Sequence, residues 1–226
     1  MKEDQLKKYG ITYLYYLTSS KNIPSILFRG IISHNMAANI AHEDFSNSSV
    51  QSGRKFSIDM HGRKIKVHDC VPLFFSTHTP MQYVLTVPSS IKARFTIPKE
   101  DLSIIEIDAL KIFKRKMVAY SDGNAASNST KFFTDLKQLN QLDWKQIRLP
   151  FPKYNQKEWK RKKSAEVLVQ NKIAPHYIAQ VCFYSHEGIR KANEYIENYC
   201  DEHSLDSKVL VKYSTKFVVE KGLFTF

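Results

Sequence analysis

A single carboxylate leads a short apolar run in the last third of the chain. Glu166 is followed by Val167-Leu168-Val169, and four basic residues occupy positions 160–163 just before it. The branched residues commit this stretch to a strand, and Pro175 marks a turn after it. An acid beside a strand is ordinarily a solvated edge residue, so Glu166 alone indicates no function. Its meaning depends on the rest of the chain.

Other short β-branched and aromatic runs alternate with helical segments. Further strands are predicted at residues 11–17, 68–76, 93–97, 116–120, 178–184, 208–211 and 217–219. Helices or helical periodicity are predicted at residues 23–30, 132–136, 139–144 and 185–200. Residues 102–107 fit either a strand or the start of a helix, and 56–58 pair plausibly with 65–67 as a hairpin. Because no repeat or linker divides the chain, we expect one α+β domain over residues 1–226.

The charge balance favours a polyanionic partner. The chain carries 34 Lys and Arg against 22 Asp and Glu, a formal net charge of +12. Such an excess suits nucleic acid or an anionic membrane surface, although many basic proteins have neither partner. Charge alone therefore decides little.

Cysteine usage and hydropathy indicate a compartment. Cys70, Cys182 and Cys200 are odd in number and far apart, so we expect neither a disulfide framework nor a zinc site. Residues 1–5 lack the apolar core of a signal peptide, and no stretch approaches the roughly 18 apolar residues of a membrane span. We expect a cytoplasmic protein with no metal and no membrane partner.

Two polar motifs are candidates for binding. Thr18 to Asn22 separate the first strand from the helix at 23–30, where exposed N–H groups suit a phosphate or a carboxamide, although helix capping explains Thr18 equally well. Arg54 lies in a long polar stretch and suits bidentate contact with a pyrophosphate, although a solvated loop arginine is as plausible. The turn at 122–124 is expected to be structural and to border a cleft.

Residues 150–163 are predicted to form a basic loop that also carries aromatic rings. Cations of this kind hold a nucleic-acid backbone, and rings stack on bases for about 1 to 3 kcal/mol each. A solvated loop with no ligand is the simpler alternative. The candidate nucleic-acid-binding residues are Tyr154, Trp159, Lys160, Arg161, Lys162 and Lys163.

Four segments together resemble the DarT family of NAD-dependent nucleic-acid ADP-ribosyltransferases, the toxins of toxin–antitoxin pairs. They lie in the family's order between residue 13 and about residue 180. The matching residues are Tyr16-Leu17-Thr18 with Asn22 to Leu27, His68 to Ser76 with Pro80-Met81, Ser121 to Ala125, and Ala165 to Val169 before Ile173 and Pro175.

The resemblance implies an ADP-ribosyltransferase-like fold, with a split mixed β-sheet flanked by helices and a cleft for NAD. Glu166 and Arg54 would be catalytic, and Tyr16, Thr18, Asn22 and Arg54 would bind the NAD co-substrate. Tyr16 stands where the family often has His, so a phenol would make that contact. Arg54 is favoured over Arg63 as the loop arginine.

The chemistry implied by the resemblance suits a lone carboxylate. Breaking the bond between nicotinamide and ribose leaves positive charge on the ribose, which a fixed anion stabilises. Glu166 would also take the proton from an attacking base nitrogen. Glycosidases instead use two facing carboxylates.

The leading hypothesis is transfer of ADP-ribose from NAD to a base of single-stranded DNA, with release of nicotinamide. The resemblance further implies a toxin, a role in phage defence, and a macrodomain antitoxin as partner. The alternatives are the same chemistry on RNA, or a non-catalytic nucleic-acid-binding module. A protein-directed transferase is disfavoured by the positive charge.

Overall fold

An eight-stranded sheet runs through the computed structural model, which describes residues 2–46, 48–87, 97–150, 157–206 and 216–225. The strands are ordered β12-β11-β6-β1-β5-β9-β7-β8. Their bounds are β1 Tyr13–Ser19, β5 Cys70–Phe74, β6 Leu102–Asp108, β7 Val118–Ser121, β8 Phe132–Phe133, β9 Glu166–Gln170, β11 Ile178–Phe183 and β12 Lys216–Val219. Two strand pairs lie outside it: β2 (Ile31–Ile32) with β10 (Lys172–Ile173), and β3 (Ser57–Met60) with β4 (Arg63–Lys66).

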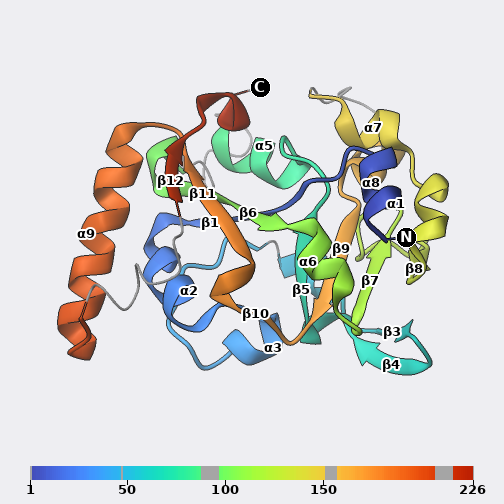
Figure 1. The fold of residues 1–226 in the computed structure, drawn as a ribbon, viewed down its shortest axis with the longest axis horizontal. Coiled ribbons are helices and arrows are strands. Elements are labelled where there is room, and N and C mark those ends of the chain that lie inside the picture. Colours follow the sequence, from blue (N-terminus) through green and yellow to red (C-terminus); the bar gives the residue numbers. More distant parts are fainter. Residues whose placement is uncertain (1, 47, 88–96, 151–156, 207–215, 226) are drawn as a thin grey trace.

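The sheet is mixed and nearly divided in two. The strands pair antiparallel except for β11 with β12. Seven residue pairs join β1 to β6, whereas the single pair Tyr15–Phe74 joins β1 to β5. Strands of the two halves run in clearly different directions in Figure 1. This narrow joint is the split that we expected.

Short helices connect the strands, and a long one follows β11. The α-helices are α1 Lys2–Lys8, α2 Ile23–Arg29, α3 His34–Ala37, α4 Ser48–Ser52, α5 Pro80–Thr86, α6 Ala109–Lys114, α7 Trp144–Arg148, α8 Lys157–Lys163 and α9 His186–His203. The 3-10 turns are η1 Ser20–Asn22, η2 Val67–Asp69, η4 Lys99–Asp101, η5 Leu136–Gln141, η6 Pro175–Tyr177 and η7 Lys221–Phe224. The helix α9 packs along α2 at one end of the molecule (Figure 1).

Local sequence explains where several helices begin and end. Ser185 caps α9, as predicted, because its hydroxyl accepts the Gly188 N–H. Pro24 lies in the first turn of α2 and Gly30 ends that helix. Gly30 has φ +88°, and a Cβ there would lie 2.3 Å from the Ile173 carbonyl oxygen, so no larger residue fits. In the described parts of the chain, no helix combines the length and apolarity needed to cross a bilayer.

The two faces of β9 have different neighbours. Val167 and Val169 belong to the main core, which also includes Leu14 and Ile105. Leu168 faces the other way, into a smaller cluster formed with the β3–β4 hairpin. Because side chains alternate along a strand, Glu166 lies on the same face as Leu168.

Most predicted elements are present, with instructive exceptions. The hairpin at 56–67 and the strand at 102–107 are confirmed. The helical assignment of 132–136 was wrong at its start, because Phe132–Phe133 form the edge strand β8 beside β7. Residues 157–163 are helix α8 rather than loop. The predicted strand at 208–211, and residues 93–96 of another, lie outside the described residues.

Candidate active site

Glu166 lies at the start of β9 and forms a buried ion pair with Arg54. The Arg54 Nη2 atom donates to Glu166 Oε2 at 2.7 Å, and Nη1 donates to Oε1 at 3.2 Å. Only 2% of the Glu166 surface and 8% of the Arg54 surface are exposed. The planar guanidinium thus contacts both carboxylate oxygens, a geometry that lysine cannot reproduce. The structure brings together the two residues that we predicted to be catalytic.

The turn after β7 holds Glu166 from its other side. The Ala125 N–H donates to Glu166 Oε1 at 3.1 Å, and the Ser121 hydroxyl accepts the Glu166 backbone N–H at 3.1 Å. Ser121 also donates to the Gly123 carbonyl at 2.6 Å. Three N–H groups therefore hold the carboxylate in one orientation, and one lone-pair direction on Oε2 stays unused by them. Sequence reasoning treated this turn as a structural border and missed its contact with the carboxylate.

The predicted NAD-binding residues lie near the end of β1. Thr18 is buried, and its hydroxyl accepts from Asn22 Nδ2 at 3.2 Å, which leaves the hydroxyl hydrogen to donate. The Asn22 amide also bonds the backbone of Glu43 twice, at 2.8 and 2.9 Å. Tyr16 packs against the main core, and burial, with a smaller contribution from Asp44, raises its pKa to about 12. Tyr16 is therefore a neutral hydrogen-bond donor, while Asn22 anchors the segment around Glu43.

The sheet places the two groups of predicted residues on either side of β5. Tyr15 pairs with Phe74, and Phe74 pairs with Glu166, so Thr18 lies two strands and three residues from Glu166. On regular strand spacings this corresponds to about 14 Å between Cα atoms. Thr18 and Glu166 therefore flank the joint between the half-sheets without touching.

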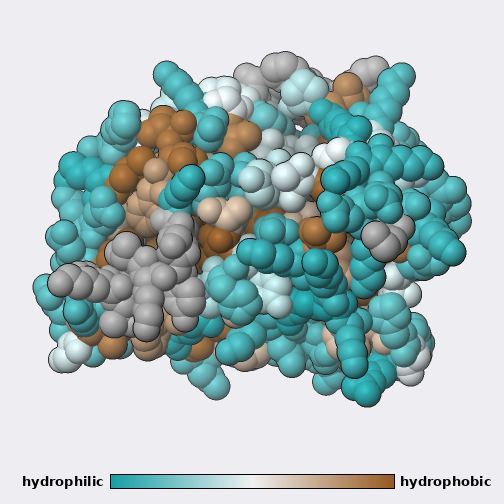
Figure 2. Space-filling view, viewed as in Figure 1, coloured by the Kyte–Doolittle hydropathy of each residue, from teal (hydrophilic) through white to brown (hydrophobic). Residues whose placement is uncertain are grey.

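A hollow of about 440 Å³ adjoins Glu166 on the α8 side. It is lined by Val50, Pro80, Asn124, Ala126, Ser127, Lys157, Lys160, Arg161 and Ser164. Lys157 and Lys160 are exposed at its rim, and neither has an ion-pair partner among the described residues. Hydrophilic residues dominate this side of the molecule in Figure 2. The hollow therefore offers two uncommitted cations.

Two predicted nucleic-acid contacts are buried instead, and these predictions were wrong as surface contacts. Trp159 is 3% exposed and Lys163 is 1% exposed, because they are four residues apart and share the inner face of α8. The Lys163 Nζ donates to the Ile147 carbonyl at 2.6 Å and to the Ser76 hydroxyl at 3.1 Å. Burial lowers the pKa of Lys163 to about 8. The i, i+4 spacing was the overlooked sign of a helix.

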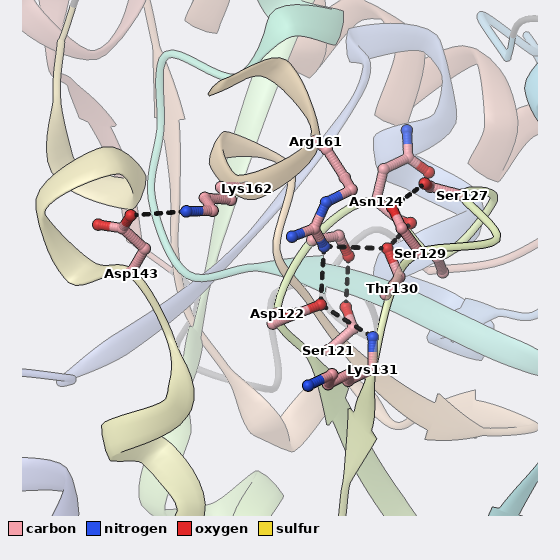
Figure 3. Close-up of polar contacts among 12 residues, drawn as sticks. Ser121, Asp122, Asn124, Ser127, Ser129, Thr130, Lys131, Asp143, Arg161 and Lys162 are labelled. Atoms are coloured by element: carbon pink, nitrogen blue, oxygen red, sulfur yellow. Dashed lines mark hydrogen bonds and ion pairs between the residues drawn. The ribbon is translucent and has the colours of Figure 1, made fainter. Parts of the chain in front are cut away.

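The neighbouring basic residues of α8 are already paired (Figure 3). Arg161 Nη1 lies 2.8 Å from Asp122 Oδ1, and Nη2 lies 2.7 Å from Glu158 Oε1. Lys162 Nζ lies 3.0 Å from Asp143 Oδ2. Arg161 consequently fastens α8 to the turn that holds Glu166, whereas Lys160 stays exposed. Tyr154 lies outside the described residues.

Within those residues, no cluster of three His, Cys, Asp or Glu side chains is arranged to hold a metal ion. Residues 15–217 match the family described as ssDNA thymidine ADP-ribosyltransferase, DarT. The chain belongs to the DarT family.

Curated DarT relatives are distant in sequence. A DNA ADP-ribosyl transferase–DNA ADP-ribosyl glycohydrolase fusion protein of Thermosipho africanus is 29% identical over 194 residues, which is 82% of this chain and 46% of the relative. A DNA ADP-ribosyl transferase of Thermus aquaticus is 24% identical over 164 residues, which is 71% of this chain and 69% of the relative. This chain thus spans about half the length of the fusion protein.

Solved DarT structures confirm the predicted fold. Thermus sp. 2.9 DarT in complex with ADP-ribosylated ssDNA superposes with a TM-score of 0.77 at 19% identity, covering 96% of this chain and 97% of that one. Thermosipho africanus DarTG in complex with ADP-ribose gives a TM-score of 0.70 at 24% identity, covering 94% of this chain and 51% of that one. The fold is therefore the α+β ADP-ribosyltransferase fold of DarT, with its mixed sheet split between β1 and β5.

Proposed function

We propose that this chain, as a single transferase domain over residues 1–226, moves ADP-ribose from NAD to a thymidine base of single-stranded DNA and releases nicotinamide. The observation that carries the proposal is the buried Glu166 carboxylate, held by Arg54 and Ala125 beside a cation-rimmed hollow. Membership of the DarT family supplies the substrate class.

The residues present fit NAD as a co-substrate. NAD supplies an electrophilic ribose carbon whose leaving group is nicotinamide. The neutral Tyr16 phenol and the Thr18 hydroxyl hydrogen are donors suited to ribose or carboxamide oxygens. Asn22 would act mainly by holding the Glu43 segment over them. Arg54 would bring its guanidinium to the same cleft from the opposite half-sheet.

Glu166 performs two tasks in the transfer. As the bond between the ribose C1′ and the nicotinamide nitrogen breaks, positive charge develops on the ribose, and the fixed anion stabilises it. The base nitrogen then forms a bond to C1′, and its proton passes to the carboxylate. A correctly placed general base contributes about 10² to 10⁴ in rate. Burial excludes water, which strengthens both effects.

Arg54 and the turn after β7 keep the carboxylate ready for these tasks. Its fork of two N–H donors and the Ala125 N–H fix both oxygens before any substrate arrives, so little reorganisation is needed in the transition state. The charge of Arg54 also offsets the cost of burying an anion.

Lys157 and Lys160 would hold the DNA backbone at the rim of the hollow. Their ammonium groups are exposed and uncommitted among the described residues, as phosphate contacts require. A single strand is the simpler substrate, because a base inside a duplex must first be flipped out at a cost of a few kcal/mol.

We further propose that the chain is the toxin of a toxin–antitoxin pair that acts in the cytoplasm, where the DNA is, with phage defence as its role. The Thermosipho africanus relative joins a DNA ADP-ribosyl transferase to a DNA ADP-ribosyl glycohydrolase in one fusion protein. A separate macrodomain antitoxin that removes the modification is the corresponding partner for this chain.

The test is incubation with NAD and thymidine-containing single-stranded oligonucleotides, read by mass spectrometry. We expect one ADP-ribose added per modified oligonucleotide and an equal amount of nicotinamide. Matched oligonucleotides without thymidine, matched RNA, and the Glu166→Gln variant serve as controls. Absence of any adduct on DNA, or equal modification of RNA, would overturn the proposal.

A further inference from the structure

The turn that carries Arg54 is held by a histidine that the proposed chemistry does not use. The Gln51 carbonyl at the end of α4 accepts the Arg54 backbone N–H at 3.0 Å. The same carbonyl lies 3.0 Å from His68 Nε2 in η2. Because a carbonyl oxygen only accepts, the Nε2 atom must carry the hydrogen. His68 and Arg54 therefore share one acceptor.

On its other side, the turn lies against the loop that holds Glu166. A Cβ at Gly53 would lie 3.0 Å from the Ala126 carbonyl oxygen and 3.1 Å from the Ala126 Cβ. Ala125, the residue before, donates its N–H to Glu166. The turn is thus confined between His68 and the Glu166 loop, with no room for a larger residue at position 53.

The His68 ring is itself well anchored. Its centroid lies 4.6 Å from that of His34 on α3, at an interplanar angle of 40°. The next residue, Asp69, accepts from Asn35 Nδ2 and from the Asn171 N–H, each at 2.7 Å. Burial, and then the neighbouring His34, lower the pKa of His68. The ring is therefore neutral at neutral pH, with its one hydrogen on Nε2.

We propose that His68 is a positioning residue, whose Nε2–H fixes the Gln51 carbonyl and thereby places the Arg54 guanidinium against Glu166. This inference rests on the proposed function, because Arg54 and Glu166 are the groups that it serves. His68 touches neither of them through the printed hydrogen bonds, so its effect passes through the backbone of residues 51–54.

Two substitutions separate this role from simple packing. In His68→Gln, the amide nitrogen stands at the same number of bonds from Cβ as Nε2 and can donate to Gln51. In His68→Asn, the nitrogen corresponds to Nδ1 and falls short of that carbonyl. Both variants lose the His34 ring contact equally, so they are matched in packing.

We expect His68→Asn to lose about tenfold in kcat for DNA modification, in line with the loss of one hydrogen bond, while His68→Gln stays near the wild type. The two variants should share one thermal midpoint. In an Arg54→Lys background, His68→Asn should cost nothing further, because a residue that acts through Arg54 cannot act when Arg54 is gone.

Equal kcat values for the Asn and Gln variants, or a full tenfold loss in the Arg54→Lys background, would overturn the proposal. A readout independent of activity is the ¹⁵N spectrum of the His68 ring, which distinguishes the Nε2–H form from the Nδ1–H form. The Nδ1–H form would refute the inference even if the wild type modified DNA. An inactive wild type with the Nε2–H form would instead refute the proposed function alone.

Discussion

The Arg54–Glu166 pair allows stability and catalysis to be separated by one double-mutant cycle. Removing one member of a buried ion pair leaves an uncompensated charge, which typically costs 3 to 5 kcal/mol. Arg54 is 8% exposed and Glu166 is 2% exposed, so solvent screens neither well. We therefore expect Glu166→Met to lower the free energy of unfolding by about 3 kcal/mol. For a domain of this size the corresponding fall in Tm is roughly 6 to 12 °C.

The double variant Arg54→Met/Glu166→Met should recover most of that stability. Replacing both members of a buried pair with apolar residues of similar size is often neutral. One cost remains, since the Ala125 N–H loses its acceptor, and this is worth about 1 to 3 kcal/mol. Activity should not recover, because the general base alone contributes about 10² to 10⁴ in rate.

Urea denaturation of the wild type, both single variants and the double variant measures the coupling free energy directly. Transfer to a thymidine-containing oligonucleotide is followed on the same preparations. The reasoning is refuted if the two single effects simply add, since the pair would then contribute nothing to stability as a pair. It is equally refuted if the double variant modifies DNA at the wild-type rate.

Two further predictions concern α8. Lys157→Glu with Lys160→Glu should weaken binding of single-stranded DNA and reduce its salt dependence by about 0.7 in log–log slope per lost phosphate contact, with KM for NAD unchanged, whereas Lys114→Glu with Lys116→Glu alters charge equally but should not change binding. For Lys163, burial lowers the pKa to about 8 from an ordinary 10.5, so the unfolded chain binds more protons between those values and stability should rise with pH across that window by up to roughly 3 kcal/mol; urea midpoints should show this rise in the wild type and not in Lys163→Met.

The amino-acid sequence alone determined the elements whose signals are local. Ser185 marked the start of α9 and Gly30 the end of α2, because capping and positive φ depend on residues adjacent in the chain. The run Val167-Leu168-Val169 identified a strand for the same reason. The motifs around Thr18, His68, Ser121 and Glu166 also sufficed to indicate the family that was later confirmed.

The sequence was less informative where an element depends on what it packs against. Residues 157–163 look like a basic loop, yet Trp159 and Lys163 face inward once α8 packs beside α7, because buried carbonyl and hydroxyl partners accept from the lysine. Phe132–Phe133 form a strand only because the edge of β7 is available for pairing. No local pattern announces such a partner.

The candidate site divides in the same way. Sequence patterns selected Glu166 and Arg54 as separate candidates, but 112 positions lie between them in the chain, and only the fold brings their charged groups to 2.7 Å. The orientation of the carboxylate likewise depends on Ala125 and on the turn confined by Gly53 and His68. Residue types record which chemistry a side chain can perform, whereas distance, burial and shared hydrogen-bond acceptors arise only when distant segments pack together.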